Sequence, residues 1–196
     1  AIRPNTRLIV MSTASNVTGT VLPFEEVGEI AAEKGIPFLV DAAQGAGVLD
    51  MDVKAMNISM LAFPGHKGLM GPQGTGGLYV GPDVKIRPIL YGGTGSRSFE
   101  TVQPDFMPDM LEAGTVNTPG IAGLGAGLQW LGNVGTERIR KKKKILLEAF
   151  FSEISRAPDI RIHSLKDAAK NSGIISLIIP GMDSSDIGTI LDKKYG

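Results

Sequence analysis

Two short apolar runs that end in charged residues constrain the fold of this 196-residue chain more than any other feature. Residues 36–40 are followed directly by Asp41, and residues 58–63 are followed by a Pro-Gly-His-Lys sequence that ends in Lys67. Each run has the length and the flanking turn residues of a buried strand. Because ligands of open α/β sheets bind beyond the carboxyl ends of the strands, we expect the Asp41 carboxylate and the Lys67 amine to face one site.

The segments around these two runs predict an α/β fold. Residues 7–11 predict a strand, Pro23 is placed for the first turn of a helix, and Gly35 is placed to end it. A strand, a helix and a strand at this spacing predict a βαβ unit with parallel strands. A short turn at residues 71–74 predicts that residues 77–80 return as an antiparallel strand.

The elements predicted in the rest of the chain are helices up to about residue 157, followed by short strands and one further helix. The remaining predicted elements are a short helix at 52–56, helices at 118–131, 136–156 and 184–193, and short strands at 160–163 and 173–179. We therefore expect a large α/β domain at 1–135, a connecting helix at 136–157 and the start of a small α+β domain at 158–196. Both ends read as cut from a longer chain, so we expect the large domain to lack its N-terminal part and the small domain to be truncated.

Four motifs, in the same order, resemble those of the class V aminotransferases. They are SNVTGT at 15–20, VDAAQGAG at 40–47, GHKGLMGPQGTGGLYV at 65–80 and LEAGTVNTPG at 111–120. Within that family they are most similar to the cysteine desulfurase and selenocysteine lyase-like branch. The resemblance implies the fold of PLP-dependent transferases (aspartate aminotransferase-like, fold type I), with a mostly parallel sheet flanked by helices. It also implies the cofactor pyridoxal 5′-phosphate (PLP).

The resemblance gives two residues the central chemistry. Lys67 corresponds to the catalytic lysine, which holds PLP as an aldimine and removes the α-proton of the substrate. Asp41 corresponds to the carboxylate that keeps the pyridine nitrogen protonated, so that the ring withdraws electrons from the substrate. By spacing alone Asp41 would be a turn residue, and most lysines only solvate a surface.

Three further residues correspond to cofactor-binding positions of the family. Gln44 would face the phenolic oxygen of PLP, His66 its phosphate, and Asn16 both the ring and the substrate carboxylate. Without the resemblance, Gln44 would be a solvated amide, His66 a core histidine and Asn16 a turn residue. One position departs from the family, because Pro64 stands where a phosphate-binding Ser or Thr is often found, and it offers neither a hydroxyl nor an N–H group.

Gly114 and Thr115 resemble the segment that reaches the phosphate in the neighbouring subunit. A glycine N–H group and a threonine hydroxyl suit an anion. The ordinary alternative is a turn before the helix that begins at Thr118. The resemblance therefore implies a homodimer with a shared active site.

Composition and charge argue against several other classes of partner. The formal net charge is zero, so we expect no nucleic acid, and the basic run at 138–144 predicts a solvated helix face. No apolar run approaches the ~20 residues of a membrane span, so we expect no membrane partner. The chain contains no cysteine and therefore no disulfide, which agrees with a cytoplasmic location. No metal site is expected.

The resemblance implies a PLP-dependent enzyme like a cysteine desulfurase. Such an enzyme converts L-cysteine, or selenocysteine, to L-alanine and leaves a persulfide on the enzyme, from which a sulfur-acceptor protein takes the sulfur. The alternatives are a class V aminotransferase or another PLP-dependent amino-acid lyase, and a non-catalytic protein or subunit of the same fold. Because sulfur transfer needs a thiolate and this chain has no cysteine, we expect these 196 residues alone to be inactive.

Overall fold

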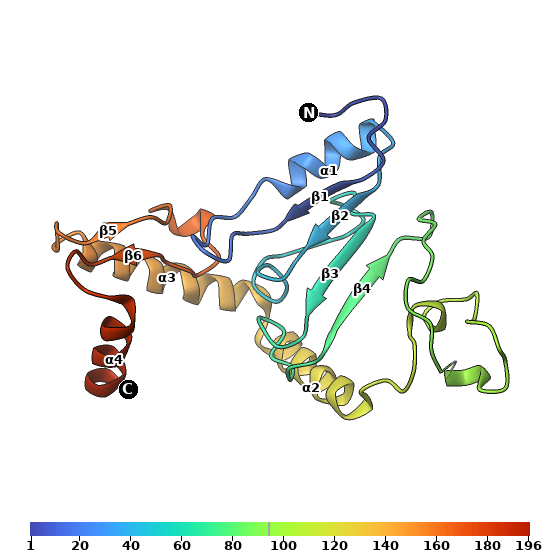
Figure 1. Ribbon diagram of the computed structural model, residues 1–196. Coiled ribbons are helices and arrows are strands. Elements are labelled where there is room, and N and C mark those ends of the chain that lie inside the picture. Colours follow the sequence, from blue (N-terminus) through green and yellow to red (C-terminus); the bar gives the residue numbers. More distant parts are fainter. Residues whose placement is uncertain (94) are drawn as a thin grey trace.

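A four-stranded sheet lies at the centre of the structure, a computed structural model that describes residues 1–93 and 95–196 (Figure 1). Its strands are neighbours in chain order: β1 (Ile9–Ser12), β2 (Phe38–Asp41), β3 (Met60–Pro64) and β4 (Gly76–Val80). The first three strands run parallel, and β4 runs antiparallel to β3. The parallel strand pair and the antiparallel return that the sequence predicts are therefore confirmed.

The carboxyl ends of the three parallel strands are level along one edge of this sheet. Ser12, at the end of β1, lies opposite Asp41, at the end of β2. Asp41 in turn lies opposite Ala62 in β3. The residues that follow these strand ends are thereby brought to the edge at which open α/β sheets bind their ligands.

The core of the sheet region is formed by β2 and by two helices, α1 (Phe24–Glu33) and α2 (Thr118–Val134). Phe38 and Val40 of β2 are completely buried. The helices add apolar side chains to the same cluster: Phe24 and Ala31 from α1, and Leu124 and Leu131 from α2. Full burial of a side chain the size of Phe38 stabilises a fold by about 1.5–3 kcal/mol, so the strand that ends in Asp41 is firmly anchored.

The long helix α3 (Thr136–Ile154) connects the sheet region to a second, smaller group of elements (Figure 1). That group contains α4 (Ser184–Tyr195) and the antiparallel pair β5 (Arg161–Ile162) and β6 (Leu177–Ile178). Single 3-10 turns complete the described elements, at Gly95–Arg97, Asp109–Leu111 and Ala168–Lys170. None of the helices within the described residues is both long and apolar enough to cross a membrane. The division into domains at residues 135 and 157 stays a prediction.

The helix predicted at residues 52–56 is wrong, because this segment forms a turn. The Asp52 carboxylate accepts hydrogen bonds from the backbone N–H groups of Lys54 and Ala55, at 2.9 and 3.0 Å. These bonds lower the pKa of Asp52. Asn57 then adopts a left-handed conformation with a φ of 53°, which Asn tolerates better than most residues. The chain therefore changes direction here and enters β3 instead of continuing as a helix.

Two helices begin at the predicted residue and are capped by the side chain of the residue before it. The Asn117 side chain accepts a hydrogen bond from the Gly120 N–H at 3.1 Å, so Asn117 rather than Thr118 caps α2. Asp183 caps α4 in the same way, by accepting from the Ser185 N–H at 2.8 Å. Asn is the better N-cap than Thr at the start of α2, whereas Asp and Ser cap equally well at the start of α4.

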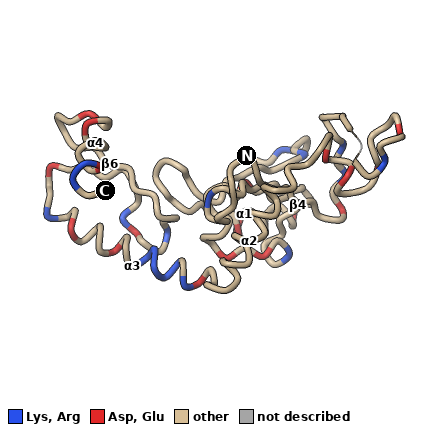
Figure 2. Tube along the Cα trace, turned by 90° about the horizontal axis from the view of Figure 1, so that it is seen from below, with Lys and Arg blue, Asp and Glu red and all other residues tan. Residues whose placement is uncertain are grey.

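The basic run at residues 138–144 lies on the first half of α3 (Figure 2). Its basic side chains are exposed except for Lys143, which is half-buried. The solvated face that the sequence predicts is thus confirmed for the rest of the run. The Lys143 amine donates a hydrogen bond to the Ser172 carbonyl at 3.1 Å, and burial lowers the pKa of Lys143.

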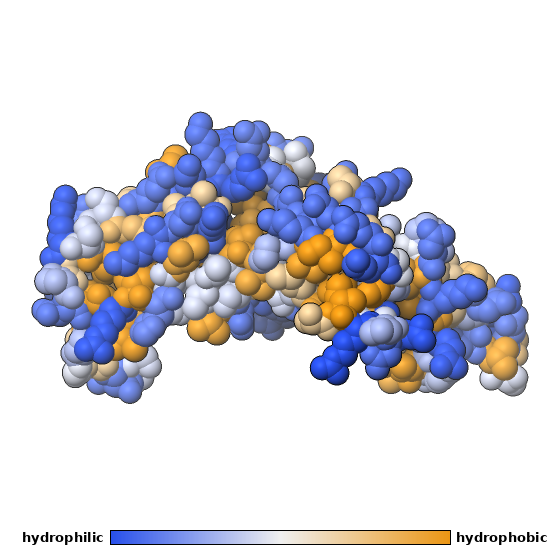
Figure 3. Space-filling view, turned by 90° about the horizontal axis from the view of Figure 1, so that it is seen from above, coloured by the Kyte–Doolittle hydropathy of each residue, from blue (hydrophilic) through white to orange (hydrophobic). Residues whose placement is uncertain are grey.

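The surface of the chain is larger than that of a self-contained globular protein. Its solvent-accessible area is 13145 Å², whereas a folded monomer of 20.7 kDa exposes about 8,900 Å². Figure 3 shows apolar patches among the hydrophilic atoms on one face. Several of the most exposed apolar side chains belong to one segment: Ile89, Leu90, Tyr91, Phe99 and Val102. Apolar surface of this kind marks contacts with further chain or with a partner.

Candidate functional site

A cavity of about 350 Å³ lies at the carboxyl ends of the parallel strands. Four of the seven predicted site residues line it together: Asn16, Asp41, Gln44 and Lys67. They come from the loop after β1, from the end of β2 and the turn that follows, and from the turn after β3. The structure therefore brings a carboxylate, an amine and two amides, far apart in sequence, to one concave site.

Asp41 is held in place by its own turn, through the carboxylate, and by a buried threonine, through the backbone carbonyl. Its Oδ1 atom accepts a hydrogen bond from the Ala43 N–H at 2.9 Å. The Asp41 carbonyl accepts bonds from the N–H group and the hydroxyl of Thr13, at 2.9 and 3.3 Å, and Thr13 is completely buried. Among the described residues no other donor reaches the carboxylate, so its second oxygen is available to a ligand in the cavity.

The turn that carries Gln44 packs directly against the turn that carries Lys67. A Cβ atom on Gly68 would lie 2.3 Å from the Ala46 carbonyl oxygen. A Cβ atom on Gly47 would lie 2.3 Å from the Gly68 carbonyl oxygen, and Gly47 has a φ of 76°. Because the two backbones touch here, the distance between the Gln44 amide and the Lys67 amine depends on these glycines.

Replacing Gly68 with alanine should destabilise the full-length protein by about 1–3 kcal/mol, because the new methyl group must push two backbone segments apart. Urea unfolding measures this change. The matched control is Gly125→Ala in α2, where a Cβ atom would meet nothing within 4 Å. That substitution should stabilise the protein by up to about 1 kcal/mol through helix propensity. Equal effects of the two substitutions would contradict the contact.

Lys67 and His66 lie in the turn between β3 and β4, and both side chains are exposed. The turn is closed by the Gly65 N–H, which donates to the Thr75 carbonyl at 2.7 Å. Lys67 faces the cavity, whereas His66 is not among the residues that line it. Pro64 is paired with Gly76 at the end of the β3–β4 ladder, where a proline that cannot donate is tolerated.

Gly114 and Thr115 lie apart from this cavity. They line a second one, of about 570 Å³, together with Gly93, Gly95, Ser96, Ser98, Asp109, Glu112 and Val116. The Gly114 N–H donates to the Gly93 carbonyl at 2.8 Å. Within one chain the structure thus does not bring Gly114 and Thr115 to Lys67, and their role toward a neighbouring subunit stays a prediction.

The sequence analysis missed two serines that line the cavity, Ser12 and Ser15. Ser15 accepts hydrogen bonds from the N–H groups of Val17 and Thr18, at 3.2 and 3.1 Å, and so shapes the loop that carries Asn16. Their signal was present, because Ser12 ends the first strand as Asp41 ends the second, and Ser15 comes three residues after Ser12.

A cavity of about 730 Å³ elsewhere in the described chain has a less polar setting, because it is lined mainly by apolar side chains, among them Leu61, Phe63, Leu69, Leu128 and Leu131. No group of three or more His, Cys, Asp or Glu residues within the described residues could hold a metal ion. The cavity with Lys67 combines an amine, a carboxylate and two amides, and its volume is in the range expected of a small-molecule site.

Comparison with known proteins assigns this chain to a group. The family model "Aminotransferase class-V" matches residues 1–196. A probable cysteine desulfurase of Methanothermobacter thermautotrophicus is 38% identical over 201 residues, covering 100% of this chain and 50% of that protein. The cysteine desulfurase IscS of Methanosarcina thermophila is 40% identical over 148 residues, covering 76% of this chain and 32% of that protein.

Solved structures give the same result. The apo structure of a cysteine desulfurase from Thermococcus onnurineus superimposes with a TM-score of 0.81 at 32% identity, covering 95% of this chain and 48% of that one. The cysteine desulfurase CsdA of Escherichia coli superimposes with a TM-score of 0.80 at 28% identity, covering 98% and 48%. The chain thus spans about half the length of the curated relatives it matches.

Proposed function

Because this chain belongs to the class V aminotransferase family, we propose that the whole protein is a PLP-dependent cysteine desulfurase that acts on L-cysteine or selenocysteine. One observation carries the proposal: Asn16, Asp41, Gln44 and Lys67 line a single cavity at the carboxyl ends of three parallel strands. The names of its relatives support the choice of reaction within the family.

The residues of the cavity fit PLP by their chemistry. A carboxylate can hold the protonated pyridine nitrogen, an amide N–H can donate to the ring oxygen, and an amine can bind the aldehyde. Asp41, Gln44 and Lys67 supply these groups. The volume of about 350 Å³ suits a small cofactor, since such sites span about 300–1,000 Å³. With Pro64 in place of a hydroxyl, the phosphate would depend on His66 and on a neighbouring subunit.

Each of these residues would have a defined role. The Lys67 amine would hold the cofactor and would also move the proton of the substrate α-carbon. The Asp41 carboxylate would keep a proton on the ring nitrogen, and Gln44 would orient the ring. Asn16 donates to the substrate carboxylate. When bound, PLP supplies an electron sink that stabilises negative charge at the substrate α-carbon.

The sulfur atom must pass to a thiolate from outside these 196 residues, because they contain no cysteine. The thiolate attacks the substrate sulfur, the C–S bond breaks, and the electron pair stays with the carbon skeleton, which takes up a proton and leaves as alanine. The products are a persulfide and alanine, and no external oxidant or reductant enters the balance. An acceptor protein and a cytoplasmic location belong to the same proposal, since a reducing compartment keeps thiols free.

We further propose that two copies share their active sites. Gly114 and Thr115 line a cavity separate from that of Lys67, so they are available to a second subunit. The neighbouring segment 89–102 exposes large apolar side chains, such as Phe99 at 103% and Ile89 at 92% of their full area. Apolar surface of this size is typical of a subunit interface.

The experiment that tests the function is an assay of the full-length protein with PLP, L-cysteine and a reductant. We expect sulfide and alanine in equal amounts, each dependent on the enzyme. An aminotransferase would instead consume a 2-oxo acid and release no sulfide, and a non-catalytic protein would release neither product. Either of these results would refute the proposal.

A further inference from the structure

The loop that carries Asn16 is held by a segment from the opposite end of the chain. The Val21 N–H donates to the Lys170 carbonyl at 3.0 Å. The Ser172 N–H donates to the Gly19 carbonyl at 2.8 Å. Residues 170–172 thus pair with residues 19–21 through the backbone, although about 150 residues separate them.

The side chain of Asn171 lies at the centre of this contact and is 7% exposed. Its Nδ2 atom donates to the Thr18 carbonyl at 3.3 Å and to the Ile174 carbonyl at 3.0 Å. Its Oδ1 atom accepts from the N–H groups of Gly173 and Ile174, at 2.8 and 3.0 Å. Both donors and both acceptor positions of the amide are therefore used, and of these bonds the one to Thr18 reaches the loop of Asn16.

Gly19 shows how closely the loop lies on Asn171. A Cβ atom on Gly19 would lie 2.5 Å from Asn171 Oδ1 and 2.4 Å from the Ile174 carbonyl oxygen. Gly19 also has a φ of 72°, which side chains rarely allow. A shift of Asn171 must therefore shift the backbone three residues from Asn16.

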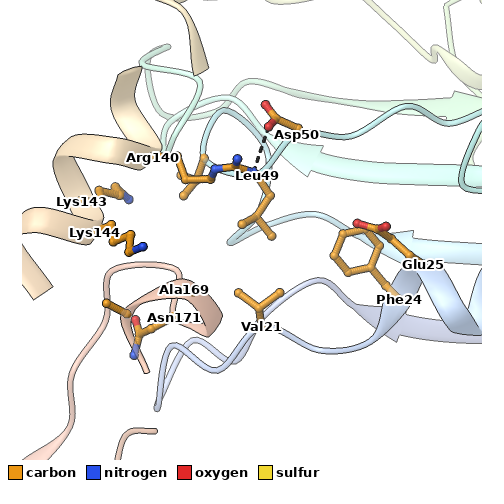
Figure 4. A pocket seen from close by; sticks show the side chains of 12 residues that line it. Val21, Phe24, Glu25, Leu49, Asp50, Arg140, Lys143, Lys144, Ala169 and Asn171 are labelled. Atoms are coloured by element: carbon orange, nitrogen blue, oxygen red, sulfur yellow. Dashed lines mark ion pairs between the residues drawn. The ribbon is translucent and has the colours of Figure 1, made fainter. Parts of the chain in front are cut away.

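The helix α3 contacts the backbone next to Asn171. Figure 4 shows Asn171, Val21 and Lys143 around one cavity, whose volume is about 420 Å³. The Lys143 amine donates to the carbonyl of Ser172, the residue next to Asn171. Arg140, one turn earlier in α3, forms an ion pair with Asp50 at 3.0 Å (Figure 4). The helix thus contacts both the segment of Asn171 and the sheet region.

We propose that Asn171 is a positioning residue, which fixes the Asn16 amide for the substrate carboxylate through its hydrogen bond to the Thr18 carbonyl. The inference rests on the proposed function, because it takes Asn16 as the contact to the substrate. It makes residues 170–176 part of the substrate-binding apparatus, although none of them lines the cavity with Lys67.

The test is Asn171→Asp in the full-length protein with bound PLP. A carboxylate keeps the two acceptor bonds within residues 171–174, but it cannot donate to the Thr18 and Ile174 carbonyls and repels both; of the two lost bonds, the one to Thr18 reaches the Asn16 loop. We expect the KM for cysteine to rise about tenfold, which is the upper range for one lost hydrogen bond, while kcat changes less than twofold. Amide hydrogen exchange of residues 15–22 should become about tenfold faster, and the PLP content should stay the same.

The matched control is Asn57→Asp. Asn57 is exposed and lies in the turn before β3, so the same change from amide to carboxylate adds a charge away from the contact between residues 170–176 and the Asn16 loop. This substitution should leave both the KM and the exchange of residues 15–22 unchanged. Asn171→Ala, which removes every bond of the amide without adding charge, replaces Asn171→Asp if that variant does not fold.

Two results would overturn the inference. One is an Asn171 variant with unchanged KM and unchanged exchange in residues 15–22. The other is an Asn171 variant whose kcat and PLP content fall while its KM shows no selective change. If the wild-type protein does not turn over cysteine at all, the proposed function fails, while the exchange measurement still decides whether Asn171 holds the loop.

Discussion

Replacing Lys67 with alanine in the full-length protein should lower the rate of cysteine turnover by about 10⁴-fold. The amine has two tasks in the proposed function, since it holds the cofactor and moves the substrate proton, and proton transfer alone contributes about 10²–10⁴-fold. The exposed turn should fold without the amine, so the fold should be unchanged. Steady-state assays of sulfide and alanine measure the loss, and circular dichroism checks the fold.

A chemical experiment identifies the same residue without an assay of activity. Borohydride treatment of the wild-type protein with PLP should attach the cofactor irreversibly to Lys67, as shown by the mass of its peptide. Lys54→Ala, which changes an exposed lysine of the sheet region, should alter neither the label nor the rate. Label on a different lysine, or a Lys67→Ala variant with normal turnover, would remove the central assignment.

Mixed dimers of Lys67→Ala and Thr115→Ala subunits should recover activity that neither variant has alone. If each site takes Lys67 from one subunit and Thr115 from the other, a mixed dimer has one site with both defects and one intact site. Random exchange makes half of the dimers mixed, so we expect roughly a quarter of the wild-type activity. Assays at limiting PLP make the loss in Thr115→Ala visible, because a lost hydrogen bond to the phosphate weakens binding roughly 10–100-fold.

The control for this experiment is a mixture of Lys67→Ala subunits with Lys67→Ala/Thr115→Ala subunits. No dimer in that mixture has an intact site, so it should stay inactive. Subunit exchange is verified by two affinity tags. Exchange without recovery of activity would show that Thr115 does not serve the partner site.

The family, the fold class and the grouping of Asn16, Asp41, Gln44 and Lys67 could be predicted from the sequence. The family and the fold are confirmed by the comparisons and the sheet topology. The grouping follows from a local rule, since each residue comes at or just after the end of a parallel strand. The roles of these residues toward PLP stay predictions.

The turn at residues 52–57 and the contact of Asn171 could not be predicted, for two different reasons. In the first case, the hydrogen bonds of Asp52 can begin either a helix or a turn. The left-handed conformation of Asn57 decides in favour of the turn. The second joins residues 18 and 171, and no local pattern in either segment indicates the other. Sequence periodicity reports which face of an element is buried, but it does not report which distant loop lies on it.

The order of the chain also sets the order in which the site can be built during synthesis. All residues that line the cavity lie between Ser12 and Lys67, and the first three strands that support them are complete by Pro64. Asn171 follows Lys67 by 104 residues, which a ribosome adds in roughly 5–20 s. The residues that line the cavity are therefore synthesised first, and Asn171, which fixes the Asn16 loop, is added seconds later. A nascent chain therefore passes through a state in which all residues that line the cavity have been made, but the Asn16 loop still lacks its hydrogen bond from Asn171.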